Sequence, residues 1–256
     1  MGKKKIDKPI LAGQIVLIIA LFAAMEYTVS KGIINGLFLA SPSQMAKELV
    51  KMIEQKLILK HTLATLWEFA AGYLLSVVTG ILTGVLFVAF PRLNRFLSPF
   101  LSALMAIPKV AIFPLLIIWF GIGFTNKVVM IFLFCYFTIF VNTRSGAEQT
   151  SDNHIKVARI FKASKAQTIW KVLLPSAIPT IFAGLKVTAA TGITGVIFAE
   201  MQASQEGLGY LLKDASSLYN TPRIFVVIIW VTILSVILVE IVGLIEKNLF
   251  MKWAKR

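Results

Sequence analysis

The sequence predicts an all-helical membrane protein with six transmembrane helices. Hydrophobic residues make up 57% of the 256 residues, whereas charged residues make up only 15%. The hydrophobic residues are gathered in long runs, each near the ~20 residues that a helix needs to cross a bilayer. Since a water-soluble domain is usually about half apolar, lipid is the expected solvent for the surplus.

Six apolar segments have the length of a membrane span. They are residues 10–30, 63–90, 97–121, 127–144, 178–201 and 224–246. The first follows a lysine-rich N-terminus, but no small-residue cleavage site clearly follows it. We therefore expect a transmembrane helix there and not a signal peptide.

The lysines and arginines predict the orientation of these spans. With both termini in the cytoplasm, 16 of the 26 basic residues lie on the cytoplasmic side, eight lie outside, and Lys109 and Lys186 lie within spans. This excess favours cytoplasmic N- and C-termini by the positive-inside rule. The net charge of +14 is spread in short clusters between apolar runs, so it indicates membrane orientation and no nucleic-acid partner.

The outer segment 31–61 contains a helix start signal. Ser41 is the expected N-terminal cap, and Pro42 suits the first helical position. Residues 45–55 alternate apolar and charged side chains at helical spacing. We expect this helix to lie along the outer membrane surface.

A basic amphipathic stretch, residues 154–175, interrupts the apolar runs on the cytoplasmic side. On a helix, Val157, Ile160 and Phe161 share one side with Ser164, and basic residues occupy the other. These basic residues are Lys156, Arg159, Lys162 and Lys165. Such a helix suits either the membrane surface or a groove on a partner, with a solvated loop as the alternative.

Prolines and threonines within the spans are candidates for a solute path. Pro108 and Pro114 each remove a backbone donor from the third span, as in a helix that lines a pathway or one with a packing kink. Thr188, Thr191 and Thr194 lie three residues apart in the fifth span. Their hydroxyls either line a polar path or bond to carbonyls of their own helix.

Small and acidic residues make further predictions about the spans. Gly80 and Gly84 form a G-x-x-x-G pair, which predicts the close approach of another helix. Glu68, Glu200 and Glu240 lie near the ends of spans, where access to water lowers the cost of their charge. They are candidate functional residues, but their positions do not suggest a proton relay.

The sequence lacks the motifs of an enzyme or of a nucleotide-binding protein. It has no G-x-x-x-x-G-K-[ST] phosphate loop, no H-E-x-x-H and no G-x-S-x-G elbow. Its two histidines, His61 and His154, lie on opposite sides of the predicted membrane, and the single cysteine, Cys135, lies in an apolar run. We expect no metal or other cofactor in this chain, and energy supplied by an ion gradient or by another chain.

The stretch 154–175 resembles the signature of the permease subunits of binding-protein-dependent ABC importers, which is E-A-A, three residues, Gly, nine residues, then I-x-L-P. Lys156-Val157-Ala158 stands at the E-A-A place, Lys162 at the Gly place, and Val172-Leu173-Leu174-Pro175 at the I-x-L-P place. Other matching segments are Leu39-Ala-Ser-Pro-Ser43, Ala106-Ile-Pro-Lys109, residues 114–123, Phe182-Ala-Gly-Leu-Lys186, Ala199-Glu200 and Gly207-Leu-Gly-Tyr210. Together they look like the branch that imports nitrate, sulfonates, taurine, bicarbonate or thiamin-pyrimidine precursors.

The resemblance implies a type I ABC importer permease (MetI-like) fold. Residues 1–62 would form a transmembrane helix and the outer-surface helix, 63–250 a core of five transmembrane helices, and 251–256 a cytoplasmic tail. Two copies of this non-catalytic chain would form a pore in the bacterial cell membrane. Two cytoplasmic ATPases would bind ATP and Mg²⁺, and an extracytoplasmic solute-binding protein would deliver the solute. An ion-coupled secondary transporter acting without an ATPase is the alternative.

The resemblance also assigns the ATPase contact to a coupling helix in the loop 145–177. The residues expected at this contact are His154, Lys156, Val157, Ala158, Arg159, Phe161, Lys162, Ala163, Ser164, Leu174 and Pro175. The residues expected on the translocation path are Pro108, Lys109, Pro114, Thr188, Thr191, Thr194 and Glu200. Lys109 and Lys186 are the bases best placed to meet an anion, although Lys186 has the alternative of extending to the interface.

Two positions depart from the signature, because Lys156 replaces its acid and Lys162 replaces its glycine. Glycine permits a left-handed turn that lysine adopts only at a cost. We therefore expect the coupling helix to continue past Lys162 towards Ala166. The added positive charge predicts an ATPase groove richer in acidic residues than usual.

Overall fold

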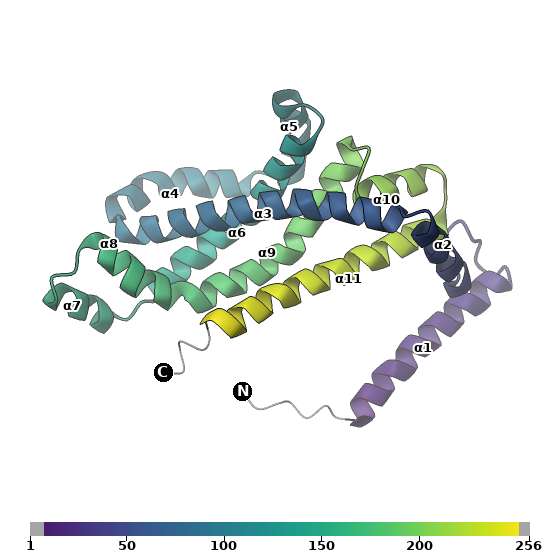
Figure 1. Cartoon of the computed structure of the whole chain (residues 1–256), viewed down its shortest axis with the longest axis horizontal. Coiled ribbons are helices and arrows are strands. Elements are labelled where there is room, and N and C mark those ends of the chain that lie inside the picture. Colours follow the sequence, from purple (N-terminus) through teal and green to yellow (C-terminus); the bar gives the residue numbers. More distant parts are fainter. Residues whose placement is uncertain (1–7, 251–256) are drawn as a thin grey trace. The chain divides into compact units, whose positions relative to one another are not determined.

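A computed structural model describes residues 8–250, and all of its regular elements are helical (Figure 1). The predicted tail, residues 251–256, lies outside the described residues. The described chain falls into two compact units. Unit 1 comprises residues 8–61 and 211–230, and unit 2 comprises residues 62–210 and 231–250.

The helices follow one another with short connections. In chain order they are α1 (Lys8–Ser30), α2 (Pro42–Glu54), α3 (Leu57–Ala89), α4 (Pro91–Ala106), the 3₁₀ turn η1 (Lys109–Ile112), α5 (Phe113–Phe120), α6 (Phe124–Glu148), α7 (Asp152–Ile160), α8 (Lys165–Thr168), the π-helical turn η2 (Ile169–Leu173), α9 (Leu174–Ala203), α10 (Leu208–Ser217), α11 (Thr221–Ile245) and the π-helical turn η3 (Glu246–Phe250). Within the described residues, five helices are long and apolar enough to cross a membrane, or six if α4 and α5 form one broken span.

The third apolar segment, residues 97–121, is not the continuous helix that its length suggests. α4 ends at Ala106, and the helical segment Lys109–Phe120 is turned from it by 85°. Pro108 lies at the break in an extended conformation. Pro114 instead lies in the first turn of α5, where a missing N–H costs no helical hydrogen bond. Of the two prolines, only Pro108 therefore marks the bend.

Small residues bring α3 against α6 in unit 2. Gly72, Ser76, Gly80 and Gly84 recur every four residues along α3. A Cβ added at Gly80 would lie 2.9 Å from Cγ2 of Ile139, and one added at Gly84 would lie 2.7 Å from Cβ of Thr143. The close helix approach predicted from the G-x-x-x-G pair is confirmed, and α6 is the helix that approaches.

A second set of small residues brings α6 against α9. A Cβ at Gly184 would lie 2.8 Å from Cβ of Asn142, and one at Gly192 would lie 2.8 Å from Sγ of Cys135. Cys135 is fully buried in this contact, as its apolar sequence context predicts. The apolar core of unit 2 surrounds it, with Phe69, Ile131, Ile139, Ile181, Leu185, Ile193 and Val196 among its members.

The helix start predicted in unit 1 is confirmed. Ser41 caps α2, its Oγ accepting from Gln44 N–H at 3.3 Å while Gln44 Oε1 accepts from Ser41 N–H at 3.1 Å. Pro42 begins the helix. Glu26 of α1 accepts from the N–H and the hydroxyl of Ser43 at 3.0 and 2.8 Å, so the start of α2 is also tied to α1.

Replacing Gly84 by leucine should destabilise the protein, because the added side chain would collide with Thr143 and with the backbone of α6. Overpacking of this kind costs about 1–3 kcal/mol. Thermal unfolding in detergent should show a lower midpoint. Gly13→Leu is the matched control, since no atom lies within 4 Å of a Cβ there; an equal loss in both variants would contradict the packing account.

Candidate functional site

The candidate coupling segment, residues 152–175, lies at one end of unit 2 and contains α7 and α8 (Figure 1). Ser151 caps α7 by accepting from Asn153 N–H at 3.3 Å. Ser164 caps α8 in a capping box, with its Oγ accepting from Gln167 N–H at 3.2 Å and Gln167 Oε1 accepting from Ser164 N–H at 2.8 Å. Both helix starts are therefore fixed by local hydrogen bonds.

The prediction that α7 continues past Lys162 is wrong. α7 ends at Ile160, and Lys162 has a φ of +51°. Lys162 N–H donates to Arg159 O and Ala163 N–H donates to Ala158 O, each at 2.9 Å. This pattern is a Schellman motif, with lysine at the position that glycine occupies most easily. The two backbone hydrogen bonds and the new cap at Ser164 outweigh the preference of the lysine for negative φ.

α7 packs on its own chain through Ala158 and Ile155, and its predicted apolar face stays uncovered. Ala158 is buried and Ile155 is half-buried, and α7 contacts η2. The apolar residues of the other face are exposed: Ile160 is 76% exposed and Phe161 is 80% exposed. Val157 is also exposed, as are the basic residues Lys156, Arg159 and Lys162. An exposed group of large apolar side chains beside cations is suited to contact with another molecule.

Within the candidate coupling segment, the π-helical turn η2 joins α8 to α9. Leu174 N–H donates to Ile169 O, five residues earlier, and closes the π-helical turn η2. Pro175 directly follows this turn. In a regular α-helix, a proline here would lack the N–H that donates to Lys171 O, and its ring would crowd that carbonyl. Such turns often mark functional sites. The Val-Leu-Leu-Pro sequence thus coincides with a built-in irregularity.

The predicted path residues are divided among several elements. Pro108 and Lys109 lie at the break after α4, and Lys109 Nζ lies 5.9 Å from the centroid of the Phe134 ring on α6. Pro114 lies in α5. Lys186, the second base within a span, pairs with Glu246 of η3 at 2.5 Å. No carboxylate of the described chain pairs with Lys109.

The three threonines of α9 differ in their contacts. Thr188 is buried and donates to Gly184 O at 2.9 Å, and Thr194 is exposed and donates to Ala190 O at 3.5 Å. Both therefore bond to their own helix. The buried hydroxyl of Thr191 has no hydrogen-bond partner within residues 8–250. The place of these residues on a solute path stays a prediction.

Glu200 holds the start of α10. It is fully buried, with its Oε1 accepting from the Thr65 hydroxyl at 2.7 Å and its Oε2 accepting from Gly209 N–H at 2.6 Å. Thr65 Oγ1 in turn accepts from Leu208 N–H at 2.9 Å. A carboxylate is favourable at these N–H groups, which lack partners within their own helix.

Two buried partners were not found from the sequence. One is Thr65, which no spacing in the sequence links to Glu200, 135 residues away. The other is Lys127, which stands at the start of the predicted span 127–144. Its ammonium pairs with Glu68 in the interior and donates to Ser204 Oγ at 3.0 Å. The path assignment of Glu200 stays a prediction beside this structural role.

The chain matches a known protein family and several curated relatives. The model of the family described as binding-protein-dependent transport system inner membrane component matches residues 76–251. Riboflavin transport system permease protein RibX of Chloroflexus aurantiacus is 32% identical over 215 residues, covering 84% of this chain and 80% of that one. Putative aliphatic sulfonates transport permease protein SsuC of Bacillus subtilis is 29% identical over 222 residues (87% and 80%). Taurine transport system permease protein TauC of Escherichia coli is 29% identical over 214 residues (80% and 77%).

Solved structures show a similar fold. A chain of the MetNI methionine ABC transporter, in its inward-facing conformations, matches with a TM-score of 0.58 and 23% identity, covering 71% of this chain and 92% of that one. A chain of an amino acid ABC transporter with histidines matches with a TM-score of 0.62 and 16% identity (78% and 98%). These likenesses support the permease fold expected from the signature. With the family match and the curated relatives, they show that this chain belongs to the binding-protein-dependent transport system inner membrane components and is the transmembrane permease subunit of an ABC importer.

Proposed function

We propose that this chain forms the membrane passage of an ATP-driven importer for a small anionic or polar solute. Separate ATPases would bind ATP and Mg²⁺, and an extracytoplasmic solute-binding protein would deliver the solute. The relatives named above are described as permeases for aliphatic sulfonates, taurine and riboflavin. Their names support a small polar solute, and the first two support an anionic group.

The exposed face of α7 is the observation that carries this proposal. Phe161 and Ile160 are large apolar side chains that lie almost uncovered beside cations. The chain has no phosphate-binding loop of its own, so ATP would have to be used by a partner. A capped helix that presents an apolar and basic face fits a groove on that partner. No observation favours the ion-coupled secondary transporter.

The proposal also includes the topology and the assembly. The distribution of lysine and arginine supports cytoplasmic termini and a cytoplasmic α7. A second copy of this chain would complete the pore. Unit 1 buries no residue of the α1 span, so this helix has its surface free for lipid or for a neighbouring subunit.

Transport should depend on ATP and not on a proton gradient. We would reconstitute the permease with its ATPase and binding protein in proteoliposomes and measure uptake of radiolabelled taurine and of a short alkanesulfonate. Uptake should require Mg-ATP on the ATPase side and should persist with a protonophore. ATP-independent uptake that the protonophore abolishes would refute the proposal.

Replacing Phe161 by aspartate should uncouple the permease from its ATPase without unfolding it, because the side chain is 80% exposed. A buried aromatic anchor at an interface is worth about 2 kcal/mol or more, so affinity for the ATPase should fall by about thirtyfold or more. Co-purification and uptake measure this loss. Leu218→Asp, at an exposed position outside α7, is the control; equal loss in both variants would argue against an α7 contact.

Substitutions of Lys162 should separate the effects of its charge and its turn. Lys162→Gly and Lys162→Asn both suit positive φ and remove the charge, and glycine should relieve about 1 kcal/mol of strain. If the ATPase groove is acidic, both variants should keep or raise thermal stability yet bind the ATPase more weakly. Lys162→Arg should retain binding. Unchanged binding in the glycine and asparagine variants would exclude a role for the charge.

A further inference from the structure

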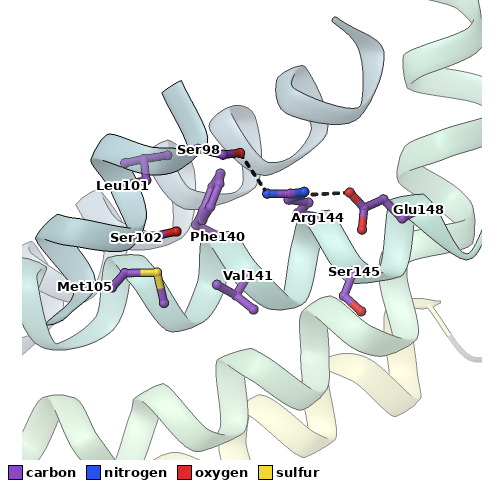
Figure 2. A pocket seen from close by; sticks show the side chains of 9 residues that line it. All are labelled: Ser98, Leu101, Ser102, Met105, Phe140, Val141, Arg144, Ser145 and Glu148. Atoms are coloured by element: carbon purple, nitrogen blue, oxygen red, sulfur yellow. Dashed lines mark hydrogen bonds and ion pairs between the residues drawn. The ribbon is translucent and has the colours of Figure 1, made fainter. Parts of the chain in front are cut away.

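A cavity of about 340 Å³ opens between α4 and α6 in unit 2 (Figure 2). It lies near the C-terminal end of α6, only a short connection before α7. Its polar lining is Ser98 and Ser102 of α4 with Arg144, Ser145 and Glu148 of α6. Ligand sites usually begin at roughly this size, about 300 Å³.

Arg144 is held across this cavity with much of its hydrogen-bonding capacity unused. Its Nε donates to Glu148 Oε1 at 2.8 Å, and its Nη1 donates to Ser98 Oγ at 3.3 Å (Figure 2). A guanidinium has five N–H donors. The other three have no acceptor among residues 8–250, and they lie on the end of the group best suited to bind an oxyanion in a bidentate manner.

The rest of the lining is apolar. Leu101 and Met105 of α4 face Phe140 and Val141 of α6 (Figure 2). Met105 and Val141 are 39% and 41% exposed, so an aliphatic chain in the cavity could contact both side chains. A bare oxyanion such as nitrate would use the arginine but would gain nothing from this surface.

We propose that this cavity binds a small organic anion, with a sulfonate or carboxylate head on Arg144 and a short aliphatic chain against Met105 and Val141. The Ser98 hydroxyl holds Arg144 and is not a further donor to the head, since it accepts from Arg144 and donates to Asn94 Oδ1 at 2.5 Å. That this anion is the transported solute rests on the function proposed above. The site therefore distinguishes an organic anion from an inorganic one as cargo.

Glu148 makes this site weak and positions its arginine. The carboxylate occupies only Nε of Arg144, which leaves the Nη groups towards the cavity, and it cancels the net charge. A weak site suits a translocation path, since a solute must enter and also leave. Glu148→Gln keeps an oxygen for Nε but removes the negative charge, so it should tighten anion binding. A merely structural ion pair would predict no such gain.

Protection of an engineered cysteine tests this site in the assembled transporter. Ser102→Cys would be exposed at the cavity, whereas the native Cys135 is fully buried and should not react. The probe is sodium 1-butanesulfonate, compared with sodium chloride and sodium nitrate at equal ionic strength. Butanesulfonate at twice its dissociation constant should slow maleimide labelling roughly threefold, and nitrate should protect less.

Three variants and one control make the result decisive. Arg144→Gln and Met105→Trp should each abolish protection, the first by removing the anion ligand and the second by filling the cavity with Arg144 intact. Glu148→Gln should increase protection. Leu104→Cys, exposed on α4 but outside the lining, should not be protected. Equal protection at Leu104→Cys, or protection that persists in the Arg144→Gln and Met105→Trp variants, would overturn the site.

The outcome is separable from that of the proposed function. If the unsubstituted transporter takes up solute with ATP but butanesulfonate protects nothing, the site is wrong and the importer stands. If protection depends on Arg144 while uptake is independent of ATP, the anion site stands and its assignment as the solute site of an ATP-driven importer is wrong.

Discussion

Close packing of helices at glycine residues is the constraint on which the rest of unit 2 depends. Gly80 and Gly84 of α3 lie against α6, and Gly184 and Gly192 of α9 lie against the same helix from another side. Lipid offers little hydrophobic drive for helices to associate, so close van der Waals contact is the main attraction that remains. Because α6 is enclosed in this way, side chains on α3, α6 and α9 are held in fixed register.

That register explains how charged groups are tolerated in the interior. Glu68 on α3 meets Lys127 on α6, and Glu200 on α9 meets Thr65 on α3. A buried charge without a partner is costly, and these pairs form only if the three helices keep their alignment. The connection after α9 is then fixed as well, since Glu200 and Thr65 satisfy the first N–H groups of α10.

Features set by local sequence were predictable, whereas features set by distant contacts were not. The apolar spans, the cap at Ser41 and the close approach at Gly84 follow from length, spacing and side-chain size. The left-handed turn at Lys162 depends on two backbone hydrogen bonds that no propensity reports. Likewise the role of Glu200 depends on Thr65, 135 residues away.

One continuous helix connects α7, at one end of unit 2, with Glu200 and the start of α10. Residues 165–203 form 39 residues of unbroken helix, with the Ser164 cap and α7 before its start and Glu200 near its end. At 1.5 Å per residue it is about 58 Å long, enough to exceed the thickness of a bilayer core. The π-helical turn before Pro175 lies between α7 and the part of the helix packed on α6. The chain thus connects α7 through this turn to the packed helix, and through Glu200 to the start of α10.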